Sequence, residues 1–144
     1  MGNKNRLSER EFDSLESMMG AFAEEAVRQA AVSHGMMLDF SPESVGRLET
    51  VLAAESPVAG SELEWATKLW GSYFGEVFRH NHPADWVMSV YPGSTMQMPA
   101  LDVQGSQLYP LLKVQRRLTM GPAEDLSTFY HKVSEALRAR SKPN

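Results

Sequence analysis

Cysteine is absent from the 144-residue sequence, which excludes disulfide bonds, thiolate zinc ligands and a cysteine nucleophile. Long apolar runs are absent as well, because no stretch approaches the roughly 20 apolar residues of a membrane helix. Residues 1–11 lack the apolar segment of a secretory leader, and Arg6 stands where an N-terminal acylation signal carries serine or threonine. We therefore expect a cytoplasmic protein that does not bind a membrane.

Common enzyme signatures are missing too. The sequence has no glycine-rich phosphate loop, no G-x-S-x-G nucleophile elbow and no H-E-x-x-H zinc helix. These motifs position phosphates, an activated serine or a metal, so each absence removes one common type of site. We predict no cofactor and no metal.

The net charge of −4 is unevenly distributed along the chain. Residues 1–102 carry 7 Lys/Arg against 15 Asp/Glu, which gives −8, and residues 103–144 carry 7 against 3, which gives +4. An acidic body repels phosphates, so nucleic acid is not an expected partner. The small basic cluster of Lys113, Arg116 and Arg117 is typical of a solvated helix face.

The length fits one domain, residues 1–144, with frayed ends at about 1–7 and 140–144. Capping pairs of Ser8 with Glu11 and of Ser61 with Glu64 indicate two helix starts, and Gly35 indicates a helix end. Apolar residues that recur every three or four positions predict five helices. These cover about residues 8–34, 42–55, 62–81, 110–120 and 126–137.

Three short strands are expected between the helices. Residues 36–40 form a short, bounded apolar run. Residues 86–90 alternate as a half-buried strand does, with Trp86, Met88 and Val90 on one face. After a turn, residues 98–103 return as an antiparallel partner, in which Pro99 needs an edge or non-bonding position. The pattern predicts an α+β domain of about five helices packed on a small, mainly antiparallel sheet.

The helix at 62–81 should be the centre of the domain. Its apolar side chains spread over about half of its circumference, which predicts burial on more than one side. Gly71 and Gly75 lie on the flank of this arc, where their lack of a side chain favours close packing of a neighbouring element. The apolar residues in question are Leu69, Trp70, Tyr73, Phe74, Val77 and Phe78.

The segment RHNHPADW, residues 79–86, contains the letters H-N-H, which also name a class of metal-dependent nucleases. Those enzymes spread their ligands over tens of residues, and three adjacent letters cannot reproduce that geometry. His80 and His82 could share a metal only with Asp85 as a third ligand and a favourable backbone bend. We reject the nuclease interpretation.

Glu76 and His80 form a more promising pair, because residues four apart are neighbours on one helix face. A carboxylate beside an imidazole at a partly buried edge, close to Trp65, could orient a general base. The same carboxylate could instead tie down the Trp86 strand through hydrogen bonds, and we favour this structural role. Asp39, just before Phe-Ser-Pro, is expected to organise a turn.

Residues 69–77, read as L-W-G-S-Y-F-G-E-V, together with Trp86, resemble a G-x-Y-x-G-E-V helix and tryptophan strand of small bacterial domains of unknown function. Residues 110–118, Gly121 and Phe129-Tyr130 resemble the C-terminal part of the same domains, so the likeness covers about 38–134. The resemblance implies that the residues Gly71, Tyr73, Gly75, Glu76 and Trp86 work together. It implies no activity, although such domains often resemble immunity or accessory proteins encoded beside secreted toxins.

Three functions remain open from the sequence. The first is a non-enzymatic bacterial binding protein, such as an immunity-type inhibitor that neutralises a cognate toxin by means of its acidic surface. The second is a hydrolase or small-molecule binder that uses Glu76 and His80, and the third is a self-assembling subunit with a methionine-rich surface. The oligomeric state is left open. The predicted binding residues are Tyr73, Glu76, His80, His82, Asp85 and Trp86.

Overall fold

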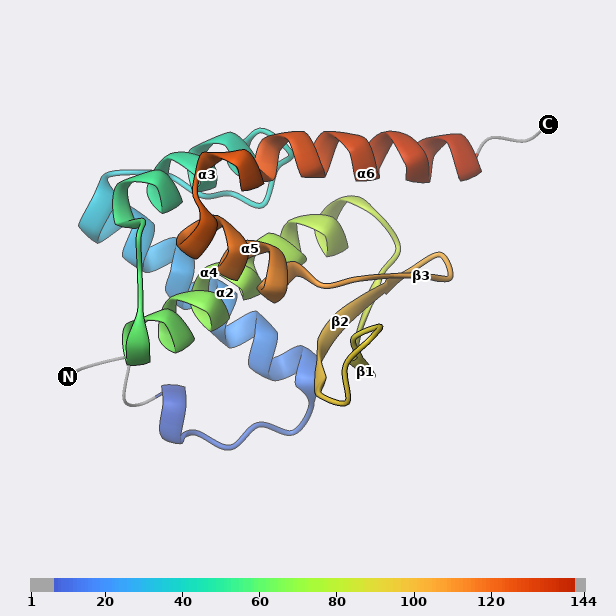
Figure 1. Ribbon diagram of the computed structural model, residues 1–144, viewed down its shortest axis with the longest axis horizontal. Helices are drawn as coiled ribbons and strands as arrows, with labels where there is room; N and C mark the ends of the chain where they lie inside the picture. The colour runs from blue at the N-terminus through green and yellow to red at the C-terminus, as the bar shows by residue number, and fades with distance from the viewer. Residues whose placement is uncertain (1–6, 142–144) are drawn as a thin grey trace.

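The computed structural model describes residues 7–141, which form a layer of helices beside one antiparallel sheet (Figure 1). This arrangement confirms the predicted α+β class. After a helical turn at residues 7–9, the elements are α2 (Leu15–His34), α3 (Ser44–Glu55), α4 (Gly60–Asn81), β1 (Asp85–Val90), β2 (Gln97–Val103), β3 (Ser106–Leu108), α5 (Pro110–Met120), the 3-10 turn η1 (Pro122–Glu124) and α6 (Leu126–Ser141).

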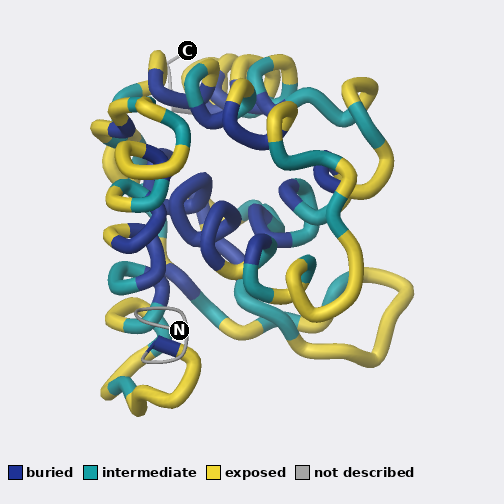
Figure 2. Tube along the Cα trace, turned by 90° about the vertical axis from the view of Figure 1, so that its left-hand side faces the viewer, coloured by how far each residue is buried: buried dark blue, intermediate teal, exposed yellow. Residues whose placement is uncertain are grey.

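Helix α4 lies at the centre of the domain, as its sequence predicts. It packs against α2 on one side and α5 on another, and Figure 2 shows its turns as buried backbone in the middle of the molecule. Trp70, Tyr73, Phe74 and Phe78 are among the largest fully buried side chains. Because α4 is covered from several directions, the other elements are positioned by the way they pack against it.

The two glycines in the interior of α4, Gly71 and Gly75, mark places of close approach. A Cβ atom at Gly71 would lie 2.8 Å from the Leu111 Cα atom of α5, and one at Gly75 would lie 2.3 Å from the Trp86 ring of β1. Ordinary van der Waals contact needs more than 3.4 Å, so neither site tolerates a side chain without movement. The two glycines therefore let α5 and the sheet approach the same helix.

The sheet has the order β1-β2-β3, and both pairs are antiparallel. A turn in which Ser94 N donates to Tyr91 O joins β1 to β2, as predicted. Pro99 lies opposite Met88 on β1, whereas β3 pairs only with residues 101–103 of β2. The proline therefore occupies a stretch with a single neighbouring strand, where its missing N–H breaks no ladder.

Strand β3 was not predicted from the sequence. It follows β2 after the two-residue turn Gln104-Gly105. Both turn residues have positive φ, 53° and 87°, as a tight hairpin of right-handed twist requires. Glutamine is an unusual residue for this backbone conformation, so the pair Gln104-Gly105 does not stand out as a turn in the sequence. The hairpin ends at Tyr109, and Pro110 begins α5 at a position where helices accept proline.

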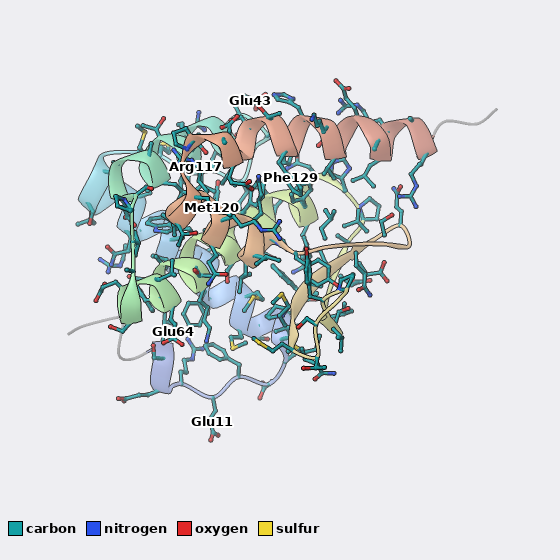
Figure 3. All side chains as sticks on the ribbon, viewed as in Figure 1. Glu11, Glu43, Glu64, Arg117, Met120 and Phe129 are labelled. Atoms are coloured by element: carbon teal, nitrogen blue, oxygen red, sulfur yellow. The ribbon has the colours of Figure 1, made fainter. Side chains whose placement is uncertain are left out.

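Two predicted helix starts were wrong. Helix α2 begins at Leu15, where Ser14 is the cap and accepts a hydrogen bond from Ser17 N at 3.0 Å. Ser8 lies in the separate turn at 7–9, and Glu11 points away from the body (Figure 3). Helix α4 begins at Gly60 without a side-chain cap, so Ser61 and Glu64 form no capping box.

Residues 36–40 are not a strand, which corrects the prediction. The segment is irregular chain in which only Leu38 is buried, and Phe40 has a φ of 62°, which ends any extended run. Helix α3 starts at Ser44, slightly later than expected, where Ser41 Oγ accepts from the Ser44 amide at 3.1 Å. The apolar composition of residues 36–40 suggested a buried strand, but Met37 and Asp39 are exposed and no strand within residues 7–141 pairs with this segment.

The face of β1 is also less buried than its alternation suggests. Trp86 is covered by α4, but Met88 and Val90 on the same face are 49% and 47% exposed. The strand therefore continues past the helical surface that covers Trp86.

Arg117 corrects the prediction of a solvated basic face. Its side chain is only 3% exposed, and its Nε donates to Glu49 Oε2 at 2.7 Å. The other Glu49 oxygen accepts from the Leu126 amide at 3.1 Å, so one ion pair joins α3, α5 and α6. Figure 3 shows Arg117 where α5 meets α6. Lys113 pairs with Glu124 at 3.0 Å, and only Arg116 of the cluster is exposed as predicted.

Of the ends that were predicted to fray, residues 1–6 and 142–144 lie outside the described residues. Leu7 and Arg140 lie in helices instead, and Arg140 Nη1 donates to Ser106 Oγ at 2.5 Å. No helix within residues 7–141 is long and apolar enough to cross a membrane.

We predict that Gly75→Ala lowers the free energy of unfolding by about 1–3 kcal/mol, because the new methyl group overlaps the Trp86 ring. Gly20→Ala is the matched control within helix α2, where a Cβ atom meets nothing within 4 Å. The control should gain up to about 1 kcal/mol from helix propensity. Urea unfolding followed by circular dichroism measures both, and equal effects of the two variants would contradict the close packing.

Candidate functional site

Glu76 is buried beneath the sheet and holds the start of β1 against α4. Its Oε2 atom accepts the Trp86 indole N–H at 2.8 Å and a guanidinium N–H of Arg79 at 3.1 Å. The residue is only 8% exposed. A carboxylate with two donors on one oxygen is engaged in holding the fold, which agrees with the structural role favoured from the sequence.

His80 has neighbours different from those of Glu76. Its ring stacks on Phe40 with centroids 4.3 Å apart and an interplanar angle of 11°. Trp65, expected nearby, lies about four helical turns before His80 on α4, about 22 Å along the axis, and packs on Phe22. The proposed base, its carboxylate and the aromatic wall therefore do not form one pocket.

Tyr73 is the partner of the irregular segment before α3. Its hydroxyl oxygen accepts the Phe40 amide N–H at 2.8 Å and lies 2.7 Å from Ser44 Oγ. Burial raises the pKa of the Tyr73 hydroxyl, although the hydrogen bond with Ser44 partly opposes that rise. Tyr73 thus stays neutral and fixes the chain between α2 and α3.

His82 follows the end of α4, where its backbone N–H caps the helix by donating to Phe78 O at 2.7 Å. Its Nε2 atom lies 3.5 Å from Ser134 Oγ on α6. Burial lowers the pKa of the His82 ring, and the positive charge of Arg138 lowers it further. Folding therefore favours the neutral form of the ring.

A shallow groove of about 530 Å³ opens where α4 passes into the sheet. It brings together two of the predicted binding residues, His82 and Asp85, but leaves out the other four, which are Tyr73, Glu76, His80 and Trp86. It also includes Asp102, which the sequence did not single out. The residues that line the groove are Arg79, His82, Pro83, Ala84, Asp85, Asp102, Gln104 and Gly105.

Acidic side chains surround the only arginine in this groove lining. Asp85 lies directly opposite Asp102 across the β1–β2 pair, a position in which like charges repel. Arg79 is already shared between Glu76 at 3.1 Å and the exposed Glu16 at 3.5 Å. The groove therefore has an excess of negative charge. Within residues 7–141, no three His, Asp or Glu side chains form a potential metal site, so Asp85 does not complete one with His80 and His82.

A cluster of hydroxyl and aromatic groups covers the face of the sheet that carries Asp85. This cluster was not predicted from the sequence. Ser89 Oγ donates to Gln107 Oε1, and the Tyr109 hydroxyl lies 3.2 Å from Ser89 Oγ. Tyr91 meets Tyr109 edge-on with ring centroids 4.9 Å apart, and Arg116 donates to the Tyr91 hydroxyl at 3.3 Å. These residues converge only when β3 and α5 are in place.

Only some of the residues that carry the family resemblance contact one another. Gly75, Glu76 and Trp86 form one contact, whereas Gly71 faces α5 and Tyr73 faces α3. Comparison of the chain with protein-family models, curated proteins and solved structures gave no match. The resemblance to small bacterial domains therefore stays a prediction.

We expect the Glu76–Trp86 hydrogen bond to couple the two residues by about 0.5–3 kcal/mol in a double-mutant cycle of Glu76→Ala and Trp86→Phe. Either single variant should destabilise the protein, and the double variant should cost less than the sum because the bond is lost only once. Chemical unfolding of the four proteins measures the cycle. Strictly additive losses would show that the bond contributes nothing.

The lowered pKa of His82 predicts loss of stability in mild acid. The unfolded chain binds a proton near the ordinary histidine value of 6.5, whereas the folded chain binds it only at lower pH, so stability falls as pH drops through that value. His82→Gln should remove this part of the pH dependence. Urea midpoints at about pH 7.5 and about pH 5.5 test it, and parallel losses in both proteins would assign the dependence to other groups.

Proposed function

We propose that this protein is a non-enzymatic binding protein that captures a basic region of a partner protein in the groove beside Asp85 and Asp102. In its more specific form, the proposal describes an immunity-type inhibitor that neutralises a cognate toxin. The observation that carries it is the pair of carboxylates facing each other across β1 and β2 in a groove with excess negative charge.

Charge supports a basic partner. A lysine or arginine side chain that enters the groove relieves the repulsion between Asp85 and Asp102, which raises its affinity over that of a neutral side chain. The excess of −8 over residues 1–102 extends this attraction beyond the groove. Complementary charge of this kind accelerates the encounter of two proteins, as an inhibitor that must act quickly requires.

The surroundings of the groove favour a protein over a small molecule. Side chains two apart on a strand share a face, so Asp85 and Ser89 of β1 lie on the face that also carries Tyr109 and Gln107. Tyrosine and arginine are the residue types that most often dominate protein interfaces, and Tyr91, Tyr109 and Arg116 stand together here. A partner can therefore bind the acidic groove and the tyrosine cluster at once.

No contact of Glu76 or His80 supports the alternative of a hydrolase that uses these two residues. Glu76 is engaged by Trp86 and Arg79, and His80 is stacked on Phe40. A general base needs a free lone pair and room for a substrate beside it, and neither residue lines the groove beside Asp85 and Asp102.

The proposal predicts that the chain co-purifies with the product of a neighbouring gene and rescues cells from that product. Asp85→Asn with Asp102→Asn should weaken the complex at least about tenfold and reduce its dependence on salt. Titration calorimetry at low and moderate salt measures both effects.

Glu64→Gln is the control for a remote negative charge, because it removes an exposed carboxylate about 22 Å along α4 from Arg79, as each single aspartate change removes one in the groove. It should leave the affinity unchanged. A complex that tolerates the double aspartate variant, or cells that die despite the protein, would contradict the proposal.

A further inference from the structure

The two edges of the sheet are protected to different degrees. The β3 edge has only three residues, and from α6 the Arg140 side chain donates to Ser106 Oγ and to Gln104 O at 2.8 Å. The β1 edge is longer, and residues 86–90, W-V-M-S-V, contain no charge, proline or glycine. Proteins normally place such residues on an edge strand to prevent pairing with another chain, so the sequence of β1 does not oppose such pairing. Helix α2 contacts β1, but the Met88 and Val90 side chains are still exposed.

The hydrogen bonds of the hairpin define which groups of β1 point outward. Tyr91 N donates to Met96 O at 3.4 Å, so residue 91 and every second residue before it bond to β2. The backbone groups of Trp86, Met88 and Val90 therefore point away from the sheet. The position of Pro99 opposite Met88 agrees with this phase, because a proline there loses no bond to β1. The Tyr109 hydroxyl donates to one of these outward carbonyls, that of Val90, at 3.4 Å, and the second lone pair of that oxygen can accept from another donor.

We propose that β1 pairs with β1 of a second copy of this chain, antiparallel and about a two-fold axis at Met88, to form a continuous six-stranded sheet. In this register Met88 faces Met88 of the partner subunit, and Trp86 faces the partner subunit's Val90. These are the positions with outward N–H and C=O groups, so each pair can exchange backbone hydrogen bonds. This inference goes beyond the proposed function, and it uses the strand edge instead of the groove.

Alternative symmetric registers fit less well. An axis at Val90 places Met88 opposite Pro92, which has no N–H to donate. An axis at Trp86 leaves only residues 85–87 paired inside β1. The axis at Met88 alone pairs residues 86–90 throughout.

The side chains of this register are self-complementary as well. Pairing brings together Met88 and Val90, which are 49% and 47% exposed in the single chain. Asp85 lies opposite the partner subunit's Tyr91, so no two like charges face each other across the new pair. Apolar surface leaves water while the charged groups remain at the ends of the strand, which favours association.

Introducing a charge of either sign at position 88 tests the proposed two-fold axis at Met88 directly. The unmodified chain should form dimers in sedimentation equilibrium, whereas Met88→Lys and Met88→Glu should each raise the dimer dissociation constant at least about tenfold, because like charges meet on the axis. An equimolar mixture of the two variants should dimerise again. Met120→Lys, which changes a methionine that is 68% exposed on α5, is the matched control and should dimerise normally.

A second variant keeps the test independent of charge. Met88→Pro removes an N–H that points away from β2, so circular dichroism should report a folded chain while the dimer is lost. Monomers of the unmodified chain at about millimolar concentration would overturn the proposal. Dimers that persist in Met88→Lys, or a variant mixture that stays monomeric, would overturn it equally.

Discussion

The architecture depends on the close approach that Gly75 permits between α4 and the Trp86 ring. A three-stranded sheet of this size has too little surface to be stable alone and must pack on helices. Trp86 supplies that contact, and its indole N–H is satisfied by Glu76, so the burial of the ring leaves no polar group unpaired. This contact holds the start of β1 on α4, and contacts of α2 with β1 and of α5 with β2 place the rest of the hairpin.

The same constraint determines which side chains remain available for binding. Glu76 and Tyr73 lie on the central helix, and their burial requires partners, which they find in Trp86 and Ser44. Asp85 and Asp102 lie where the hairpin leaves the helix, so their carboxylates face the groove. Polar groups near the core are thus used for the fold, whereas those at the first exposed residues of the sheet can contact a partner.

The sheet, at one end of the molecule (Figure 1), offers two chemically different surfaces. Its polar face combines the acidic groove with the tyrosine cluster, and its outer edge is an apolar strand. Charge acts over several ångströms and selects a basic partner, whereas backbone pairing acts only in register and selects an extended strand. The two proposed interactions therefore rest on different groups of the same hairpin, namely side chains of the polar face in one case and the backbone of β1 in the other.

The sequence by itself determined the helices, the β1–β2 hairpin and the central position of α4, because periods of 3.6 and 2 residues report directly which side chains must leave water. It also indicated that Gly75 adjoins a close neighbour. Only the tertiary structure decided the start of α2 at Leu15, the irregular path of residues 36–40 and the burial of Arg117. Capping letters and apolar runs occur in many contexts, and long-range neighbours choose among them. The groove was hidden for the same reason, since Asp85 and Asp102 are 17 residues apart and meet only through the register of two strands.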